Sequence, residues 1–216
     1  MHIYDGSDGN KYPSVTTIIH NILLYPDPLL KWANSIGLGR KKYDDIMLKS
    51  SIKGTAVHEL LQSYMTGCEV SCSIPIADEM SIRYIMIEAE KYFKKHNMGP
   101  ATTRSAELTI VSPKLRYAGT LDWLGEMDGS LTLVDYKTSK DIRPYMPIQL
   151  AAYDKLLQEE ENIVVDQACI LLMKDTGVVP KIFTRHELDM YFEIFLHMQA
   201  IFEGMHMMEE LLKNES

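Results

Sequence analysis

The stretch from Tyr117 to Lys140 most constrains what this chain can fold into. It predicts two β-strands joined by a turn at Asp128–Gly129, because Asp-Gly between alternating apolar residues is a strong hairpin signal. The second strand runs through an apolar Leu-Thr-Leu-Val segment and ends with Asp135 and Lys137 on one face, since successive side chains alternate across a strand. Charged groups are costly to bury unless they pair or bind a metal.

The first strand of this hairpin adds Asp122, so two carboxylates and a lysine are expected close together. Such a cradle suits a divalent cation that prefers oxygen ligands. An ordinary cross-strand charge pair between Asp135 and Lys137 is the alternative, because Asp-x-Lys occurs by chance in many proteins. Asp122, Asp135 and Lys137 alone do not distinguish a metal site from a structural charge pair, so the other motifs of the chain have to be considered.

Composition sets the class of protein. A chain of 216 residues with 46% hydrophobic and 24% charged residues fits one soluble globular domain. It has no run of eighteen apolar residues, which predicts no membrane association, and its polar start lacks a signal-peptide core. Three cysteines (Cys68, Cys72 and Cys169) without metal-ligand spacing predict a reduced, cytoplasmic setting without disulfides or an iron–sulfur cluster.

The net charge of −8 excludes a protein whose whole surface attracts nucleic acid. It leaves room for a local basic groove, because a site that gathers carboxylates around a metal is itself acidic when empty. Composition therefore leaves nucleic-acid binding open.

The first half of the chain is expected to be mainly helical. Residues 1–13 are expected to be an extended lead-in, and Ser14 is a good N-cap for a helix that follows it. A second helix is expected from Leu29 to Ser35, carrying Trp32. The basic cluster Arg40–Lys42 is a solvated face by default, with a phosphate contact as the alternative.

A helix from Ser51 to Met65 carries His58 at its middle. Its expected apolar stripe consists of Ile52, Ala56, Val57, Leu60, Leu61 and Tyr64. A lone histidine there is usually a hydrogen-bonded structural residue, and the second histidine of a His-Glu-x-x-His zinc site is missing. Gly54 lies on the same helical face as His58 and leaves space for another backbone or a substrate to approach.

The second half changes to strands and helices that together predict a single α/β domain over residues 1–216. Its expected elements, after a helix from Ala77 to Asn97, are a strand Ser105–Val111, the organising hairpin, a helix Ile148–Glu160, a strand Val164–Lys174, its partner Val178–Thr184 and a last helix His186–Lys213. Within the domain, residues 1–100 form the helical part, 101–185 the catalytic sheet and its helix, and 186–216 the C-terminal helix.

Four short motifs follow one another along the chain. They are Gly54-x-x-x-His58-x-x-Leu61, Gly119-x-x-Asp122, Asp135-x-Lys137-Thr138 and Gln149-x-x-x-Tyr153. In this order they resemble the PD-(D/E)xK nuclease superfamily, in its RecB-like exonuclease branch, and within that branch small phage-type and mitochondrial genome maintenance exonuclease-like members. The resemblance covers roughly residues 12–185 and implies a restriction-endonuclease-like core, a central mixed β-sheet flanked by helices.

The resemblance implies a metal centre. Asp122 and Asp135 would be the central ligands of one or two ions, the backbone carbonyl of Tyr136 would add an oxygen, and His58 would shift the preference from Mg²⁺ towards Mn²⁺. Asp135 departs from the family pattern, which more often has Glu there. Glu107 would face a second metal or its water, with a solvent-side strand glutamate as the alternative.

The remaining implied roles concern water and DNA. Lys137 would position or help to deprotonate the attacking water and offset charge on the phosphate. Gln149 and Tyr153 would hold their helix against the site and contact the DNA backbone. Phosphate contacts are expected, from proximity alone, at Thr138, Ser139, Lys140 and Arg143.

These roles predict a metal-dependent DNA exonuclease that acts on DNA ends or single strands in recombination or repair. The alternatives are a structure-specific or restriction-like endonuclease, an inactive DNA-binding module on the same scaffold, and a metal hydrolase of another substrate class. A bacterial or phage-infected cell is the expected setting, with a recombination or replication protein as a candidate partner. The sequence leaves the oligomeric state open.

Overall fold

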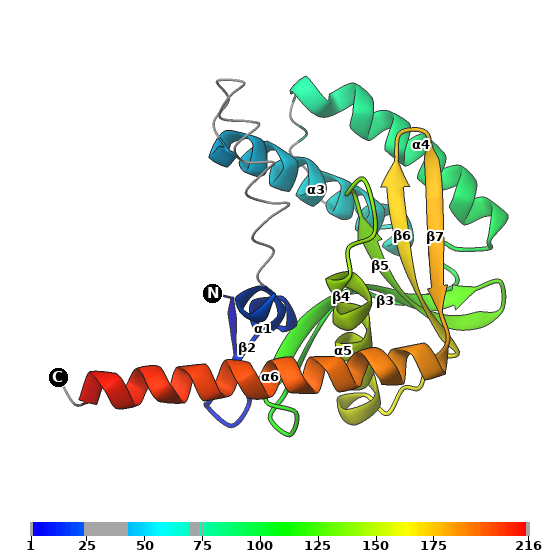
Figure 1. Cartoon of the computed structure of the whole chain (residues 1–216). Helices are drawn as coiled ribbons and strands as arrows, with labels where there is room; N and C mark the ends of the chain where they lie inside the picture. Colours follow the sequence, from blue (N-terminus) through cyan, green and yellow to red (C-terminus); the bar gives the residue numbers. More distant parts are fainter. Residues whose placement is uncertain (1, 24–42, 70–73, 75, 215–216) are drawn as a thin grey trace.

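A mixed five-stranded sheet with helices on both faces forms the centre of the molecule (Figure 1), which confirms the expected α/β class. The computed structural model describes residues 2–23, 43–69, 74 and 76–214. In chain order its elements are β1 (Ile3–Asp5), β2 (Lys11–Pro13), α1 (Val15–Ile22), α3 (Tyr43–Thr66), a 3-10 turn (Ile76–Asp78), α4 (Glu79–Lys95), β3 (Thr103–Ser112), β4 (Tyr117–Met127), β5 (Ser130–Lys137), α5 (Tyr145–Glu160), β6 (Gln167–Lys174), β7 (Gly177–Phe183) and α6 (Arg185–Asn214).

The sheet has the strand order β3-β4-β5-β6-β7, and only the β5–β6 pair is parallel. Parallel neighbours need a crossover connection, which α5 provides. Asp128 and Gly129 both have positive φ, 52° and 81°, so the turn between β4 and β5 is of the tight kind that matches strand twist. The predicted hairpin is therefore confirmed.

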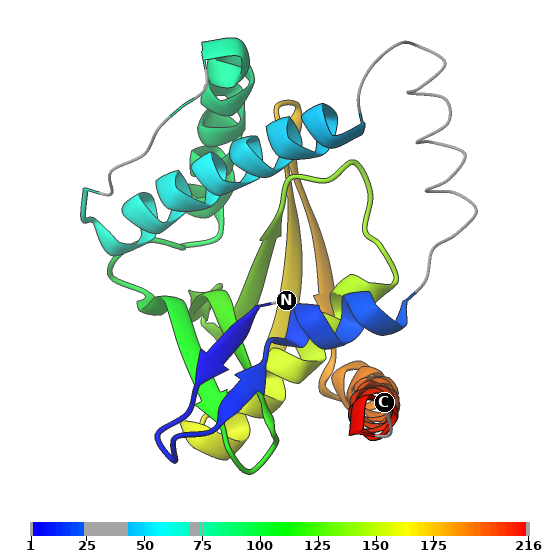
Figure 2. The same cartoon turned by 90° about the vertical axis from the view of Figure 1, so that its left-hand side faces the viewer.

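Two hydrophobic clusters lie on opposite faces of the sheet. One contains buried side chains of α1, α5 and α6, and the other those of α3 and α4. Figures 1 and 2 show the same division, with α3 and α4 on one side of the strands and α5 and α6 on the other. The sheet is the middle layer of three, and burial of both faces provides most of the favourable free energy of folding.

The alternation of side chains reverses partway along β3 and β4. In β4, Leu121 packs in the α5 cluster but Trp123, two residues later, packs in the α3–α4 cluster. In β3 the same change separates Leu108 from Ala106. Glu107 lies between these two residues with a φ of 52°, a left-handed conformation that interrupts the extended repeat. This reversal is absent from the sequence prediction, which treats Ser105–Val111 as a regular strand.

Several predicted boundaries need correction. α3 begins at Tyr43 rather than Ser51. Ile52, which was expected in the apolar stripe, is 42% exposed, because the first turns of α3 do not pack on the sheet. α5 begins at Tyr145, before the expected Ile148, since Pro147 fits in a first helical turn where no N–H is needed. The expected helix Leu29–Ser35, with Trp32, the Arg40–Lys42 cluster and Cys72 lie outside the described residues.

The expected lead-in is a two-stranded sheet instead. β1 and β2 pair in antiparallel fashion, with Tyr4 opposite Tyr12. Ser14 then caps α1 as predicted, because its hydroxyl oxygen accepts a hydrogen bond from the Thr17 N–H at 2.9 Å. The Tyr4 hydroxyl lies 3.0 Å from Thr120 Oγ1, which ties the start of the chain to β4.

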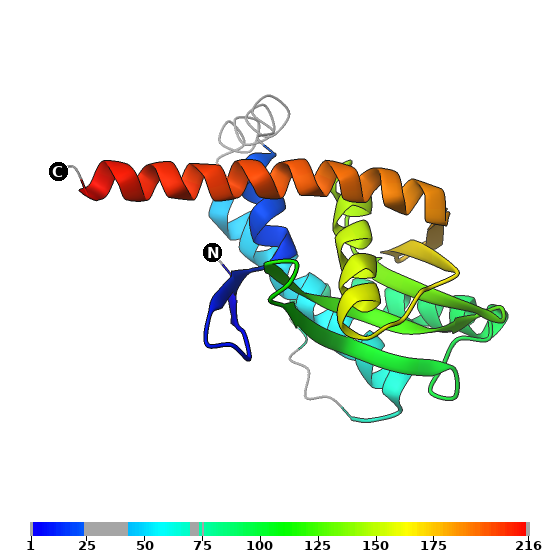
Figure 3. The ribbon, with the colours of Figure 1, turned by 90° about the horizontal axis from the view of Figure 1, so that it is seen from below.

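Helix α6 packs against α5 near its start and against α1 near its middle, and then extends past the rest of the molecule (Figure 3). Its first residue, Arg185, donates to the buried Asp154 carboxylate of α5 through both terminal nitrogens. The pairing fixes the start of α6 on α5. Among the described helices, none has an apolar segment of the length and hydrophobicity required to cross a membrane.

We predict that Gly119→Ala destabilises the fold, because a Cβ at this position would clash with the ring of Tyr153. Overpacking of this kind costs about 1–3 kcal/mol. Urea denaturation followed by circular dichroism measures the change. Gly204→Ala is the control: no atom lies within 4 Å of its Cβ position on α6, so a gain of about 0.5–1 kcal/mol is expected from helix propensity. An unchanged midpoint for Gly119→Ala would contradict the packing argument.

Candidate functional site

Three side chains from three elements meet at one point. His58 from α3, Glu107 from β3 and Asp122 from β4 each offer a ligand atom, and these atoms all lie within 4.8 Å of one another. His58 Nδ1 is 3.3 Å from Asp122 Oδ1 and 3.9 Å from Glu107 Oε1. The side chains are only partly exposed, so the group is a recess in the surface and not a solvated acidic patch. Two carboxylates and an imidazole fit Mg²⁺ or Mn²⁺, with the imidazole favouring Mn²⁺.

The reversal in β3 and β4 is what brings Glu107 into this group. The pairs Ala106–Trp123 and Leu108–Leu121 keep one register, and Glu107 and Asp122 lie between them. A non-glycine residue at positive φ costs on the order of 1–3 kcal/mol, and such residues cluster at functional sites. Of the two roles left open by the sequence, the geometry places Glu107 beside His58 and Asp122 rather than alone in solvent.

Asp122 is held through both oxygens. Its Oδ2 accepts a hydrogen bond from the Tyr136 N–H at 2.6 Å, while Oδ1 faces His58. Burial works to raise the pKa of Asp122, but His58, Lys137 and the Tyr136 N–H outweigh it and bring the pKa below its usual range. Asp122 therefore stays charged in a buried position.

The same balance charges His58. Burial opposes protonation, but the carboxylates of Asp122 and Glu107 outweigh it and raise the pKa of His58 to about 10. The single positive charge on the imidazole compensates one of the two negative charges of Asp122 and Glu107. Such a compensated group of charges exchanges a proton for a cation when a metal binds.

Asp135 and Lys137 form a second pair next to this group. Lys137 Nζ lies 2.8 Å from Asp135 Oδ1 and 2.7 Å from Oδ2. Burial raises the pKa of Asp135 to about 6, despite the opposing charge of Lys137. Burial opposes the charge on Lys137, but Asp135 and Asp122 outweigh it and raise its pKa.

One atom of this pair has no hydrogen-bond partner. Asp135 Oδ2 is buried and in ion-pair contact with Lys137 Nζ, but it accepts no hydrogen bond of good geometry from any described residue, which leaves it capacity to bind a further group. Asp135 does not belong to the 4.8 Å group of His58, Glu107 and Asp122. Its predicted role as a metal ligand therefore needs a shift of its side chain or an ion shared between the two groups.

Tyr136 lies between Asp135 and Lys137 on β5. Its ring is buried and packs at right angles to the His58 ring, with centroids 6.1 Å apart. Its N–H serves Asp122. The expected role of its carbonyl as a metal ligand stays a prediction.

Gln149 and Tyr153 meet on one face of α5, as their spacing predicts. The Gln149 amide donates to the Tyr153 hydroxyl at 2.7 Å, and both side chains are buried. Gly119 gives the Tyr153 ring room against β4. The pair therefore orders α5 against the strand that carries Asp122, and its contact with DNA stays a prediction.

The segment after Lys137 carries the predicted phosphate contacts. Lys140 and Arg143 are exposed, while Thr138 and Ser139 are partly buried. Thr138 lies beside Gly54, whose missing Cβ would be 3.5 Å from Thr138 Oγ1, an ordinary contact distance. Gly54 is therefore not required by the packing of the described residues, and its small size leaves the mouth of the site open.

A pocket of about 540 Å³ opens onto the group of His58, Glu107 and Asp122. It is lined by Gly54, Thr55, His58, Glu59, Gln62 and Glu107. Glu59, Gln62 and Thr55 are site-lining residues that the sequence reasoning missed. The spacing of Thr55 and Gln62, three and four residues from His58, was a signal that could have found these two, because residues so spaced share a helical face, whereas Glu59 directly follows His58.

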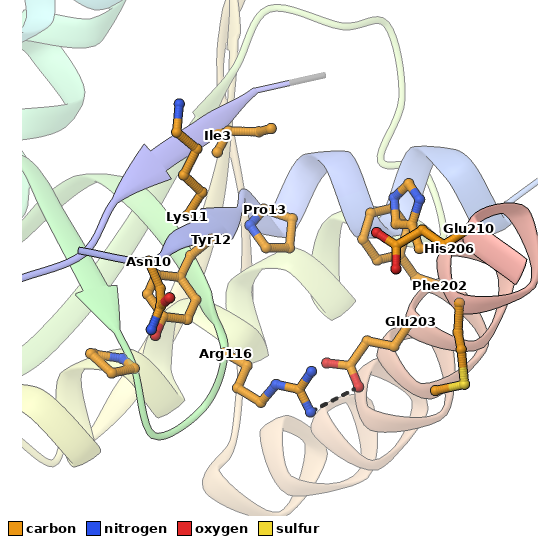
Figure 4. Close-up of a pocket in the computed structure, with 12 residues that line it drawn as sticks. Ile3, Asn10, Lys11, Tyr12, Pro13, Arg116, Phe202, Glu203, His206 and Glu210 are labelled. Carbon is orange, nitrogen blue, oxygen red and sulfur yellow. Dashed lines mark ion pairs between the residues drawn. The ribbon is translucent and has the colours of Figure 1, made fainter. Parts of the chain in front are cut away.

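A second pocket, of about 910 Å³, lies between the β1–β2 hairpin, the β3–β4 turn and α6 (Figure 4). Figure 4 shows Arg116 and Glu203 joined across it, and their charged atoms are 3.3 Å apart. None of the residues predicted to be catalytic or metal-binding lines this pocket. It is thus separate from the candidate site.

The chain resembles known proteins in part. No protein-family model matches it. It is 25% identical over 174 residues to the human protein named mitochondrial genome maintenance exonuclease 1, across 76% of this chain and 49% of the human protein. A crystal structure of a candidate exonuclease from Eubacterium rectale matches 69% of this chain and 66% of its own, at 12% identity and a TM-score of 0.43. The chain thus spans about half the length of the human relative.

We predict that Glu107→Gln weakens Mn²⁺ binding about tenfold or more, because one of the two charged oxygen ligands of the group is lost. Isothermal titration calorimetry without DNA measures the affinity. Glu126→Gln is the matched control, since Glu126 is an exposed acid on β4 whose described ion pair is with Arg104. An unchanged affinity in Glu107→Gln would remove Glu107 from the ligand set.

Proposed function

We propose that this protein is a metal-dependent nuclease that hydrolyses phosphodiester bonds in DNA, and that it acts as an exonuclease on ends or single strands during recombination or repair. The observation that carries the proposal is the group of His58, Glu107 and Asp122 beside the Asp135–Lys137 pair, on α3 and the neighbouring strands β3, β4 and β5. The similarity to a human protein named an exonuclease supports the same activity.

The donor set suits one or two ions of Mg²⁺ or Mn²⁺, held by His58, Glu107 and Asp122, with Asp135 and the Tyr136 carbonyl as the further predicted ligands. A divalent cation bound there would lower the pKa of a water molecule and polarise a phosphoryl oxygen. The protein's own task is to hold the ligands in place.

The chain's residues divide that task. The Tyr136 N–H fixes the orientation of Asp122. Lys137, whose pKa is raised although burial opposes it, brings a positive charge to the place where negative charge grows on the phosphate. Of the two roles predicted for Lys137, the raised pKa favours charge stabilisation and positioning of water over removal of its proton.

The DNA backbone would enter across the exposed segment after Lys137. Lys140 and Arg143 are the exposed cations there, and Thr138 and Ser139 are the hydroxyl donors. Phosphate contacts position a nucleic acid without reading its sequence, which suits an enzyme that digests DNA of any sequence. Gln149 and Tyr153 would support the site indirectly, by holding α5 against β4.

The test compares end-labelled linear single-stranded DNA, linear duplex and a closed circle, each with Mn²⁺, Mg²⁺ or chelator. We predict metal-dependent loss of linear DNA only. Lys137→Met is expected to lower turnover by about 10² to 10⁴-fold with DNA affinity nearly intact, because a group used mainly in the transition state is lost. Lys95→Ala, an exposed lysine of α4, is the control and should behave as the unaltered protein.

The outcomes separate the alternatives. Nicking of the closed circle would make the protein an endonuclease. DNA binding without cleavage under either metal would leave only a DNA-binding module on this scaffold. Equal activity of Lys137→Met and the unaltered protein would show that this lysine has no catalytic role.

A further inference from the structure

The start of the chain carries an aromatic pair, His2 just before β1 and Tyr4 within it, that the proposed chemistry does not use. The His2 and Tyr4 rings stack with centroids 4.7 Å apart and planes 12° apart. Their side chains leave the same face of the chain, because residues two apart share a face in extended backbone. His2 is exposed and Tyr4 is partly exposed, so the pair is not sealed inside the protein.

The backbone beneath these rings is fixed. The His2 N–H donates to Thr17 Oγ1 at 3.0 Å, and the His2 carbonyl accepts from the Ser14 N–H at 3.0 Å. The Thr17 hydroxyl donates back to the same carbonyl at 3.1 Å. These bonds tie the pair to the start of α1, so a ligand that stacked on it would find the rings already ordered.

The pair lies beside β4, the strand that carries Asp122. The Tyr4 hydroxyl is 3.0 Å from Thr120 Oγ1, and Thr120 is two residues before Asp122 on β4, a rise of roughly 7 Å. Figure 2 shows β1 and the start of the chain on the face below α3, the helix that supplies His58. A strand whose phosphate reached the metal centre would therefore have bases within reach of the pair.

We propose that His2 and Tyr4 form a base-stacking subsite for an unpaired nucleotide of the DNA strand that is being cut. The inference rests on the proposed function and deepens it, because it assigns a single strand as the form of DNA bound. Aromatic faces stack on every base and so accept any sequence. Bases of an intact duplex already stack on one another, so only a single strand or an unpaired end can use the subsite.

The exposure of His2 distinguishes this role from simple packing. The β1–β2 hairpin is already held in place by the His2 backbone hydrogen bonds, by the β1–β2 pairing and by the Tyr4 hydroxyl. A ring that served only to pack the hairpin would be covered, but the His2 ring is exposed. The ring of His2 adds no hydrogen bond among the described contacts of the hairpin. Its stacking face is what remains for a ligand.

The first test measures binding of a fluorescent single-stranded oligonucleotide in chelator, where no metal-dependent cleavage occurs. We predict that His2→Ala and Tyr4→Leu each weaken the affinity about tenfold, the usual effect of removing one stacking side chain, while Tyr4→Phe keeps most of it. Tyr84→Leu and His186→Ala replace an exposed tyrosine on α4 and an exposed histidine on α6, and should leave the affinity unchanged. Thermal unfolding of each variant checks that it is folded.

Salt dependence separates stacking from a charge contact. The slope of log affinity against log salt concentration should be the same in His2→Ala and the unaltered protein, because stacking releases no counterion. A slope reduced by about 0.7 would mean that His2 contacts a phosphate, and would overturn the proposal. An equal loss in Tyr4→Phe and Tyr4→Leu would also overturn it, because the hydroxyl and not the ring would then matter.

The second test places one abasic site at each position of the oligonucleotide in turn. We predict that at one position the missing base weakens binding about tenfold in the unaltered protein. In His2→Ala the same abasic site should have little further effect, because the stacking contact between that base and the His2 ring is already lost. In cleavage, the same variants should raise KM rather than lower kcat, since the subsite lies away from the reacting phosphate. Equal losses at every abasic position in both proteins would overturn the subsite.

Failure of the proposed function looks different. If the unaltered protein cuts no DNA with either metal, the nuclease proposal fails whatever the aromatic variants do. If it cuts single-stranded DNA and the aromatic variants match it in affinity and KM, only the stacking subsite fails.

Discussion

A single carboxylate, that of Asp122, joins the parts of this molecule that have to stay in register. One oxygen faces His58 of α3 and the other accepts the Tyr136 N–H of β5, so the helix layer and two neighbouring strands meet at one side chain. Because Asp122 is largely buried, it is stable as an anion only while these partners stay in place. The position of the histidine helix over the sheet therefore depends on the same contact that forms the candidate metal group.

The electrostatics of the site follow from burial combined with compensation. His58 and Lys137 carry raised pKa values because carboxylates lie against them, although burial opposes both shifts. Asp135 shows the opposite balance, since burial raises its pKa to about 6 despite the lysine at 2.7 Å. His58 and Lys137 thus compensate part of the negative charge of the three carboxylates. A buried group of this kind costs stability that packing elsewhere has to supply, and the two hydrophobic clusters on the faces of the sheet provide it.

Local signals in the sequence predicted much of the fold. The Asp-Gly turn, the Ser14 cap and the spacing of Gln149 and Tyr153 each depend on residues a few positions apart, and each was confirmed. The predicted starts of α3 and α5 were wrong. The first turns of α3 are exposed and the first turn of α5 contains Pro147, so neither has a buried apolar stripe that would mark the start of a helix. The position of Glu107 beside His58 and Asp122 depends on its positive φ, and no pattern of residues in the sequence predicts that conformation. The Tyr4–Thr120 contact joins residues 116 positions apart, and no local reading could have found it.

The left-handed residue at Glu107 lies where the side chains of β3 and β4 exchange the faces of the sheet to which they point. On one side of it, the odd-numbered residues of β4 point to α5, and on the other side they point to α3 and α4. A one-residue insertion or deletion in an ordinary strand turns every later side chain to the wrong face. Here the chain already contains one such change in two paired strands, and the pairs on either side of it, Ala106–Trp123 and Leu108–Leu121, keep one register. Over evolution, a glycine at position 107 would preserve the architecture at little cost, whereas a β-branched residue would disturb both hydrophobic cores at once.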